Sequence, residues 1–140
     1  MTTPHTDIEV LDGALEILER DGMWCQGAYY YIDEGGQKLS FCAEGAIREA
    51  AGYWNVVQAK ENPEFPGRVD SLNWQYIDLI NVEPIHDQCA KLENMVLANS
   101  DNQANGLNGF NDDEHTTVGD VLLAMKKTRE EIANAVIQER

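Results

Sequence analysis

Cys42 is placed where a thiol could act as a nucleophile. The ten residues after it, AEGAIREAAG, are mostly small and predict a short helix that begins at Cys42 and ends at Gly52. The positive end of a helix dipole and its free amides lower the pKa of a thiol at that position. The alternative is a small buried residue that joins a strand to this helix.

A cysteine nucleophile also needs a base, and the chain offers three histidines, which are His5, His86 and His115. The order Cys42 then His115 is that of papain-like enzymes, although those enzymes hold the histidine on a strand that the sequence does not predict here. We therefore consider Cys42 with His115, oriented by Asn111 or Asp112, as a candidate catalytic set. The alternative for the last three residues is local hydrogen bonding in a turn before a helix.

Cys25 lies near Cys42 in any pairing of the hairpin predicted between them, so the two thiols could form a redox pair or half of a metal site. A zinc site would need two further ligands, such as His86 or Cys89. The cysteines match no Cys-x-x-Cys pattern, and the chain has no glycine-rich phosphate loop and no His-Glu-x-x-His motif. We expect no cofactor.

The segment DNQANGLNGFND, residues 101–112, lies between two predicted helices and can be compared with the EF-hand calcium loop of about twelve residues. The residues that fall on its ligand and glycine positions are Asp101, Gln103, Asn105, Gly106 and Asp112. Gln103, Asn108 and Asp112 depart from the residue types usual at their positions. Asparagine and glycine are also common in ordinary exposed loops, which is the alternative.

The chain is strongly acidic, with 25 acidic and 10 basic side chains and a formal net charge of −15 over 140 residues. Residues 61–115 hold eleven of the acidic and two of the basic side chains. Direct binding to nucleic-acid phosphates is not expected, because there is no basic stripe to release counterions. Three alternative explanations of this acidity stay open: a solvated surface, a face that docks on a basic protein, or mimicry of nucleic-acid charge.

The N-terminus shows no basic start and no apolar run of a secretory signal, and no stretch approaches the roughly 18 apolar residues of a membrane-spanning helix. The three cysteines are odd in number and irregularly spaced, which argues against a disulfide scaffold. We expect a soluble protein in a reducing cytoplasm.

The N-terminal third predicts a helix followed by a hairpin. Thr6 and Glu9 form a capping box ahead of an apolar stripe at helical spacing, and Gly22 is placed to end that helix. AYYYID and KLSFC then flank EGGQ, a pattern typical of a β-hairpin. On this prediction Tyr30 and Ile32 share one face.

After Gly52 we expect a surface connection held to the core by four apolar residues, which are Trp54, Val56, Val57 and Phe65. A helix is predicted to begin at Asp70 or Ser71, and a second one at Pro84. Residues 99–111 read as a loop. Thr117 and Asp120 form a capping box before a last helix, whose buried side we expect to be Val118, Val121, Leu122, Met125, Ile132 and Val136.

Three short blocks of the chain stand out, which are LDGALEILERDG-WCQGA, the C-x-x-GA-x-x-x-A pattern that starts at Cys42, and the Asn111–Asp112 pair ahead of TTVGDV. In this order they resemble a family of uncharacterised short proteins of bacteria, notably actinobacteria, and their phages. The resemblance covers about half of the chain and implies a provenance in a phage or mobile element, with no assigned activity. We take Trp24, Cys25 and Gln26 of the first block as candidate binding residues.

These patterns predict a single domain over residues 1–140 of the α+β class, mainly α, with about five helices packed around one short β-hairpin. Our leading prediction is an acidic, non-catalytic protein that binds another, basic protein through residues 61–115, without contacting nucleic acid or membranes. The alternatives are a cysteine-dependent enzyme that uses Cys42 with His115 and a metal-binding protein that uses Asp101, Asn105 and Asp112.

Overall fold

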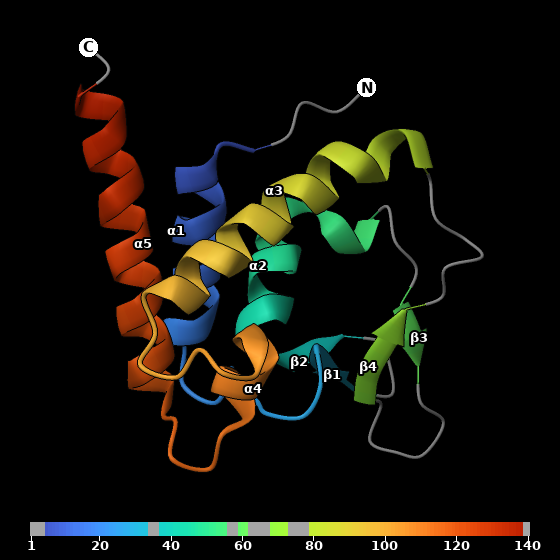
Figure 1. Ribbon diagram of the computed structural model, residues 1–140. Coiled ribbons are helices and arrows are strands. Elements are labelled where there is room, and N and C mark those ends of the chain that lie inside the picture. The colour runs from blue at the N-terminus through green and yellow to red at the C-terminus, as the bar shows by residue number, and fades with distance from the viewer. Residues whose placement is uncertain (1–4, 34–36, 56–58, 62–67, 73–78, 139–140) are drawn as a thin grey trace.

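The computed structural model describes residues 5–33, 37–55, 59–61, 68–72 and 79–138 (Figure 1). Its elements are α1 (Asp7–Glu19), β1 (Tyr30–Ile32), β2 (Lys38–Phe41), α2 (Ala43–Ala51), the 3-10 turn η1 (Tyr53–Asn55), β3 (Ala59–Glu61), β4 (Arg68–Leu72), α3 (Leu79–Ala98), α4 (Gly106–Asp112) and α5 (Val118–Gln138). The predicted class, α+β and mainly α with five helices and a hairpin, is confirmed.

The helices form one body with a small sheet at its lower end (Figure 1). α1 packs between α2 and α5, and α3 crosses in front of α2 and also contacts α5. The largest fully buried side chains come from all five helices, η1 and β4, and include Leu11, Tyr53, Leu92, Phe110 and Met125. Within the described ranges, every helix is too short or too polar to cross a bilayer.

Both predicted capping boxes are present. The Thr6 hydroxyl accepts from the Glu9 amide at 3.1 Å while the Glu9 carboxylate accepts from the Thr6 amide at 2.9 Å. Thr117 and Asp120 make the same reciprocal pair before α5, at 3.3 and 2.9 Å. Gly22 has the expected positive φ of 76°, but α1 already ends at Glu19, so this glycine shapes the following turn.

The hairpin is confirmed, with Tyr30 opposite Phe41 and with Tyr30 and Ile32 buried. It belongs to a larger antiparallel sheet of order β2-β1-β4-β3. The prediction of a helix at Asp70 or Ser71 is wrong, because Arg68–Leu72 is β4. Val69 pairs with Tyr30 and is fully buried, and its carbonyl accepts from the Tyr29 amide at 2.8 Å. Partners far away in the chain override the helical spacing of this segment.

Three further expectations for the C-terminal half are wrong. Pro84 lies inside α3 rather than at the start of that helix. In this interior position the proline removes one backbone hydrogen bond, but the helix stays continuous. Residues 99–111 are not all loop, because Gly106–Asp112 is α4 and buries Leu107 and Phe110. On α5, Val121 and Met125 are buried as expected, but Val136 is 43% exposed.

α2 begins at Cys42 and ends at Gly52, whose φ of 81° is the predicted left-handed cap. Its small residues let it lie directly on the backbone that leads into β1. A Cβ built on Gly45 would lie 1.9 Å from the Tyr29 carbonyl oxygen. Trp54 packs against this region as predicted and donates to the Gly45 carbonyl at 3.3 Å, whereas Val56, Val57 and Phe65 lie outside the described residues.

Candidate functional site

Cys42 lies at the start of α2, as predicted, but it is buried. Its Sγ accepts a hydrogen bond from the Gly45 amide at 3.2 Å, and its exposed fraction is 3%. Burial raises the pKa of the Cys42 thiol far above its ordinary value, although the Gly45 amide opposes the shift. The thiol stays protonated at neutral pH, which contradicts the lowered pKa expected from the helix end.

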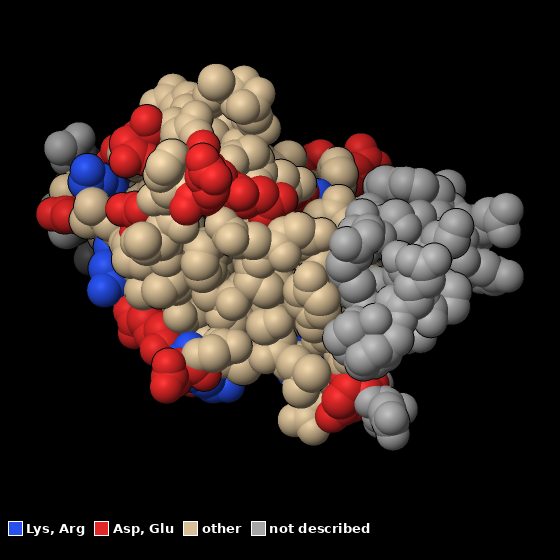
Figure 2. Space-filling view, turned by 90° about the horizontal axis from the view of Figure 1, so that it is seen from below, with Lys and Arg blue, Asp and Glu red and all other residues tan. Residues whose placement is uncertain are grey.

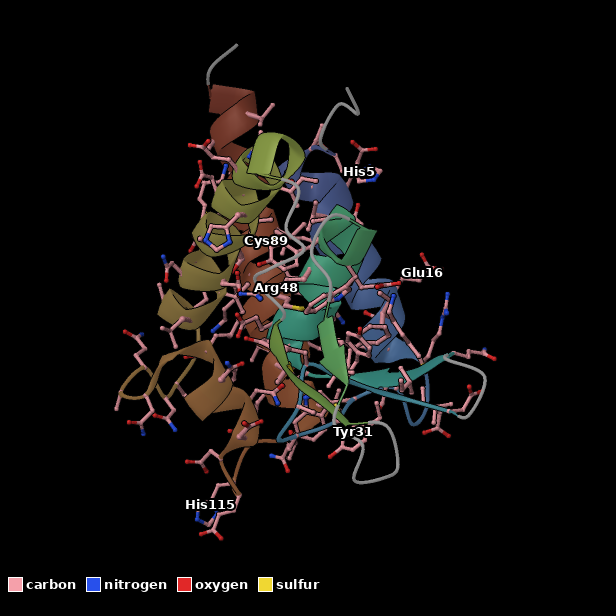
Figure 3. All side chains as sticks on the ribbon, turned by 90° about the vertical axis from the view of Figure 1, so that its right-hand side faces the viewer. His5, Glu16, Tyr31, Arg48, Cys89 and His115 are labelled. Carbon is pink, nitrogen blue, oxygen red and sulfur yellow. The ribbon has the colours of Figure 1, made fainter. Side chains whose placement is uncertain are left out.

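His115 lies on the loop before α5 and points away from the body of the protein (Figure 3). Its side chain is 87% exposed, its Nε2 lies 3.3 Å from Glu114 Oε1, and its amide donates to Asp113 Oδ1 at 2.8 Å. An imidazole in this position does not pack against the buried Cys42 thiol. The structure therefore does not bring the predicted catalytic pair together.

The surroundings of the other two cysteines also keep their thiols protonated at neutral pH. All three cysteines are free thiols. Burial raises the pKa of Cys25 to about 11 and that of Cys89 to about 12. His86 is exposed on α3, with its ring 6.1 Å from that of Tyr53. Among the residues that the structure describes, no three His, Cys, Asp or Glu side chains are placed to hold a metal ion.

The calcium-loop prediction for residues 101–112 finds no support in the geometry. Half of the segment is the helix α4 rather than a loop that wraps around an ion. Asp101 is exposed, and Asn105 precedes α4 without capping it. Asp112 Oδ1 accepts from the Gly27 amide and from Asn111 Nδ2, both at 2.9 Å. The three predicted ligands thus serve different parts of the fold.

Asn111 is the centre of a buried hydrogen-bond network, with an exposed fraction of 0%. Its Oδ1 accepts from Trp24 Nε1 at 2.8 Å and from the Ala43 amide at 2.9 Å. Its Nδ2 donates to the Cys25 carbonyl at 3.0 Å and to the Asp112 carboxylate. One side chain of α4 therefore fixes both the segment before the hairpin and the first turn of α2.

Gln26 and Gly27 extend this network to the surface. Gln26 Nε2 donates to the carbonyls of Asn111 and Asp113 at 2.9 and 3.0 Å, and the Gly27 amide donates to Asp112. We call these contacts, together with those of Trp24 and Cys25, the Asn111 network. The residues predicted to bind a ligand, Trp24, Cys25 and Gln26, use their polar groups within the protein.

A second cluster contains the buried charged side chains of the described residues, which are Glu44, Arg48 and Glu93. Arg48 of α2 lies against α3 in the interior (Figure 3). Its Nη2 pairs with Glu44 Oε1, one helical turn away, and lies 3.5 Å from Glu93 Oε1 on α3. The Arg48 Cζ lies 5.0 and 4.6 Å from the ring centroids of Tyr29 and Tyr53. We call these three charged residues the Glu-Arg-Glu site.

The protonation of this site follows from its burial. Burial, and then the neighbouring Glu44 carboxyl, raise the pKa of Glu93 to about 9, although Arg48 opposes the shift. Burial alone would lower the pKa of Arg48, but Glu44 and Glu93 raise it above its ordinary value. One guanidinium thus faces two carboxyl groups, and the pair retains one proton at neutral pH.

The Glu-Arg-Glu site forms one wall of an open cavity of about 330 Å³. Its other lining residues include three with amide side chains, Asn94, Asn105 and Asn108, and three with apolar side chains, Ala90, Leu97 and Leu107. A smaller cavity of about 190 Å³ beside Cys42 shares Asn108 with it. A cavity with perturbed titratable groups and convergent amides is the arrangement typical of a binding site.

Glu93→Gln is expected to weaken the pH dependence of stability. The folded protein keeps the Glu93 proton up to about pH 9, whereas an unfolded glutamate loses it near pH 4.5. Between these values the folded state binds more protons, so the free energy of unfolding falls as pH rises, by up to about 1.4 kcal/mol per pH unit. Glutamine does not titrate, so the free energy of unfolding of the variant should rise relative to that of the wild type from pH 5 to pH 9. Urea unfolding at a series of pH values measures this difference.

Glu83→Gln is the matched control, because Glu83 is exposed on the same helix. This variant should follow the wild-type pH dependence. If the free energies of unfolding of the wild type and Glu93→Gln change in parallel with pH, that result would contradict a proton held at the Glu-Arg-Glu site.

Sequence reasoning missed the Glu-Arg-Glu site, although part of a signal is present. Glu44 and Arg48 are four residues apart on a short helix whose other positions are mostly alanine and glycine, and so many small residues predict packing on several sides. Glu93 directly follows Leu92 of the apolar stripe of α3. Its pairing with Arg48 joins residues 45 positions apart and follows from no local pattern.

Comparison with known proteins identifies one match. The model of a family of unknown function, DUF6197, matches residues 2–131, which is nearly the whole chain. No curated protein and no solved structure matches the chain. The chain belongs to DUF6197, a family of unknown function.

Proposed function

We propose that this protein is a non-catalytic binding protein that takes up a cationic group of a basic protein partner at the Glu-Arg-Glu site. The observation that carries this proposal is the charge balance of the cavity wall. Two nearly buried carboxyl groups, with side chains 12% and 11% exposed, face a single guanidinium. The site is one positive charge short of neutrality unless a proton or a cation supplies it.

Glu93 is the carboxyl group with which we expect an incoming cation to pair, because Arg48 lies closer to Glu44 than to Glu93. Its Oε1 lies 3.5 Å from Arg48 Nη2, longer than the roughly 2.9 Å of a good N–H···O hydrogen bond, while Glu44 makes the closer pair. An ammonium or guanidinium group that enters the cavity would replace the proton at Glu93. A charge-assisted hydrogen bond would then form in a site with little water.

The outer surface favours the approach of such a partner. The exposed acidic side chains of residues 61–115 include Glu83, Asp87, Asp101, Asp112 and Glu114. On the face shown in Figure 2, Asp and Glu gather in groups across the upper part and at the lower edge, and Lys and Arg are fewer. A net charge of −15 attracts a basic partner over long range and accelerates its association at low salt.

The test is calorimetric titration with acetyl-Ala-Lys-Ala-amide and with the same peptide carrying Gln in place of Lys. The lysine peptide should bind at least about tenfold more tightly. Its affinity should rise from pH 6 to pH 9, with release of a proton that shows as a dependence of the heat on the buffer. Glu93→Gln should lose this preference and Glu83→Gln should keep it. Equal or undetectable binding of the two peptides to the wild type would overturn the proposal.

The alternatives predicted from the sequence lack comparable support. A cysteine-dependent enzyme requires an activated thiol beside a base, whereas the pKa of Cys42 is raised by burial and His115 is in solvent. A metal-binding loop requires converging carboxylates, and residues 106–112 are helical. An origin in a phage or mobile element and a cytoplasmic location stay predictions.

A further inference from the structure

Arg48 holds hydrogen-bond donors that the described residues leave unused. Its side chain is 9% exposed, and its Nε and Nη1 are buried without a hydrogen-bond partner among the residues that the structure describes. Its Nη2 alone serves both Glu44 and Glu93. Tyr29 and Tyr53 lie over the guanidinium and offer ring faces rather than acceptor oxygens. Buried donors of a charged group are rarely left unpaired, so the site lacks an acceptor.

Other residues that line the cavity can form hydrogen bonds with a peptide group. Asn94, Asn105 and Asn108 are exposed and line the same cavity as Arg48. A primary amide both donates and accepts, which matches the amide and carbonyl of a main chain. Arg48, the two carboxyl groups and the three amide side chains thus line one cavity of about 330 Å³.

We propose that the ligand of this cavity is a lysine or arginine residue within a peptide chain. Arg48 donates a hydrogen bond to the main-chain carbonyl of that residue, while the carboxyl groups of Glu44 and Glu93 bind its side-chain cation. This inference rests on the proposed function and deepens it, because it adds recognition of the partner's main chain by Arg48 to the binding of its cationic group. A free amine satisfies the carboxyl groups but leaves the Arg48 donors unpaired. Recognition of both groups therefore separates a peptide from a simple amine.

The experiment compares n-butylamine, free lysine and Nα-acetyl-lysine N-methylamide as probes of the full chain at pH 8. The acetyl-lysine amide should bind at least about tenfold more tightly than butylamine. Arg48→Lys keeps the charge but removes the extra donors, so it should reduce that ratio to about twofold or less. Arg129→Lys, at an exposed arginine that pairs with Asp12, should keep the full ratio.

A second measurement on the wild type does not depend on the folding of Arg48→Lys. In proton–nitrogen NMR spectra, the Arg48 Nε–H signal should shift with the acetyl-lysine amide and stay in place with butylamine. Equal affinity of the two probes, or an unmoved Nε–H signal, would overturn this inference and leave the cation-binding proposal standing. Tighter binding of free lysine would assign the site to an amino acid instead of a peptide. No binding of any probe would overturn both proposals.

Discussion

Asn111→Ala is expected to lower the free energy of unfolding by about 3–4 kcal/mol, because it leaves several buried polar groups without partners. The Trp24 indole, the Ala43 amide and the Cys25 carbonyl all bond to the Asn111 side chain, which is completely buried. Each of these groups then loses a hydrogen bond to a completely buried side chain. Urea unfolding followed by tryptophan fluorescence measures the loss.

Two variants show whether the network is the cause. Asn111→Asp keeps the shape but places an oxygen against the Cys25 carbonyl and the Asp112 carboxylate, so at pH 7 its loss should be at least as large as that of the alanine variant. Asn134→Ala, on the exposed side of α5, should stay within about 0.5 kcal/mol of the wild type. A loss below about 1 kcal/mol for Asn111→Ala would show that the network contributes little.

Gly45→Ala is expected to lower the free energy of unfolding by about 3 kcal/mol or more, against the usual gain from alanine in a helix. The added Cβ would lie 1.9 Å from the Tyr29 carbonyl oxygen and 2.8 Å from its carbonyl carbon. Both atoms are backbone, so relief requires α2 to move away from the strand. That movement would also stretch the hydrogen bond from the Cys42 amide to the Tyr29 carbonyl, now 3.1 Å.

Gly119→Ala is the matched control for this substitution. Gly119 is exposed in the first turn of α5, and its nearest contact for a Cβ is Thr117 Oγ1 at 3.5 Å, an ordinary distance. Alanine should therefore be neutral or stabilising there by up to about 1 kcal/mol. Chemical denaturation of both variants separates crowding from helix propensity, and a Gly45→Ala protein as stable as Gly119→Ala would contradict the close approach.

The Asn111 network and the Glu-Arg-Glu site meet at the first turn of α2. Asn111 holds the Ala43 amide, and Glu44 follows directly in the sequence. α4, which carries Asn111, also carries Asn108 of the cavity wall. The network thus positions residues that line the cavity, and under the proposed function it would affect binding only indirectly. Substitution of Asn111 should therefore lower the free energy of unfolding, while the molecules that remain folded should keep their affinity for a ligand.

The sequence was sufficient to predict local structure wherever residues close together in the chain form each other's hydrogen bonds or turns. The capping boxes of Thr6 and Thr117, the left-handed Gly52 and the hairpin between Tyr30 and Phe41 depend on residues a few positions apart. Their geometry follows from backbone conformation and side chains of the same segment. The sequence alone therefore predicted the mainly α class, the helices α1, α2 and α5, and the position of Cys42 at a helix start.

Tertiary structure decided everything that depends on distant partners. Arg68–Leu72 is a strand because β1 pairs with it, and Pro84 is tolerated within α3 because the rest of that helix packs against α2, α4 and α5. The helix end at Cys42 favours a reactive thiol, but burial outweighs the dipole. The cavity wall arises from Arg48 and Glu93 on different helices. Contacts between segments far apart in the chain have no local pattern, so only the folded chain reveals them.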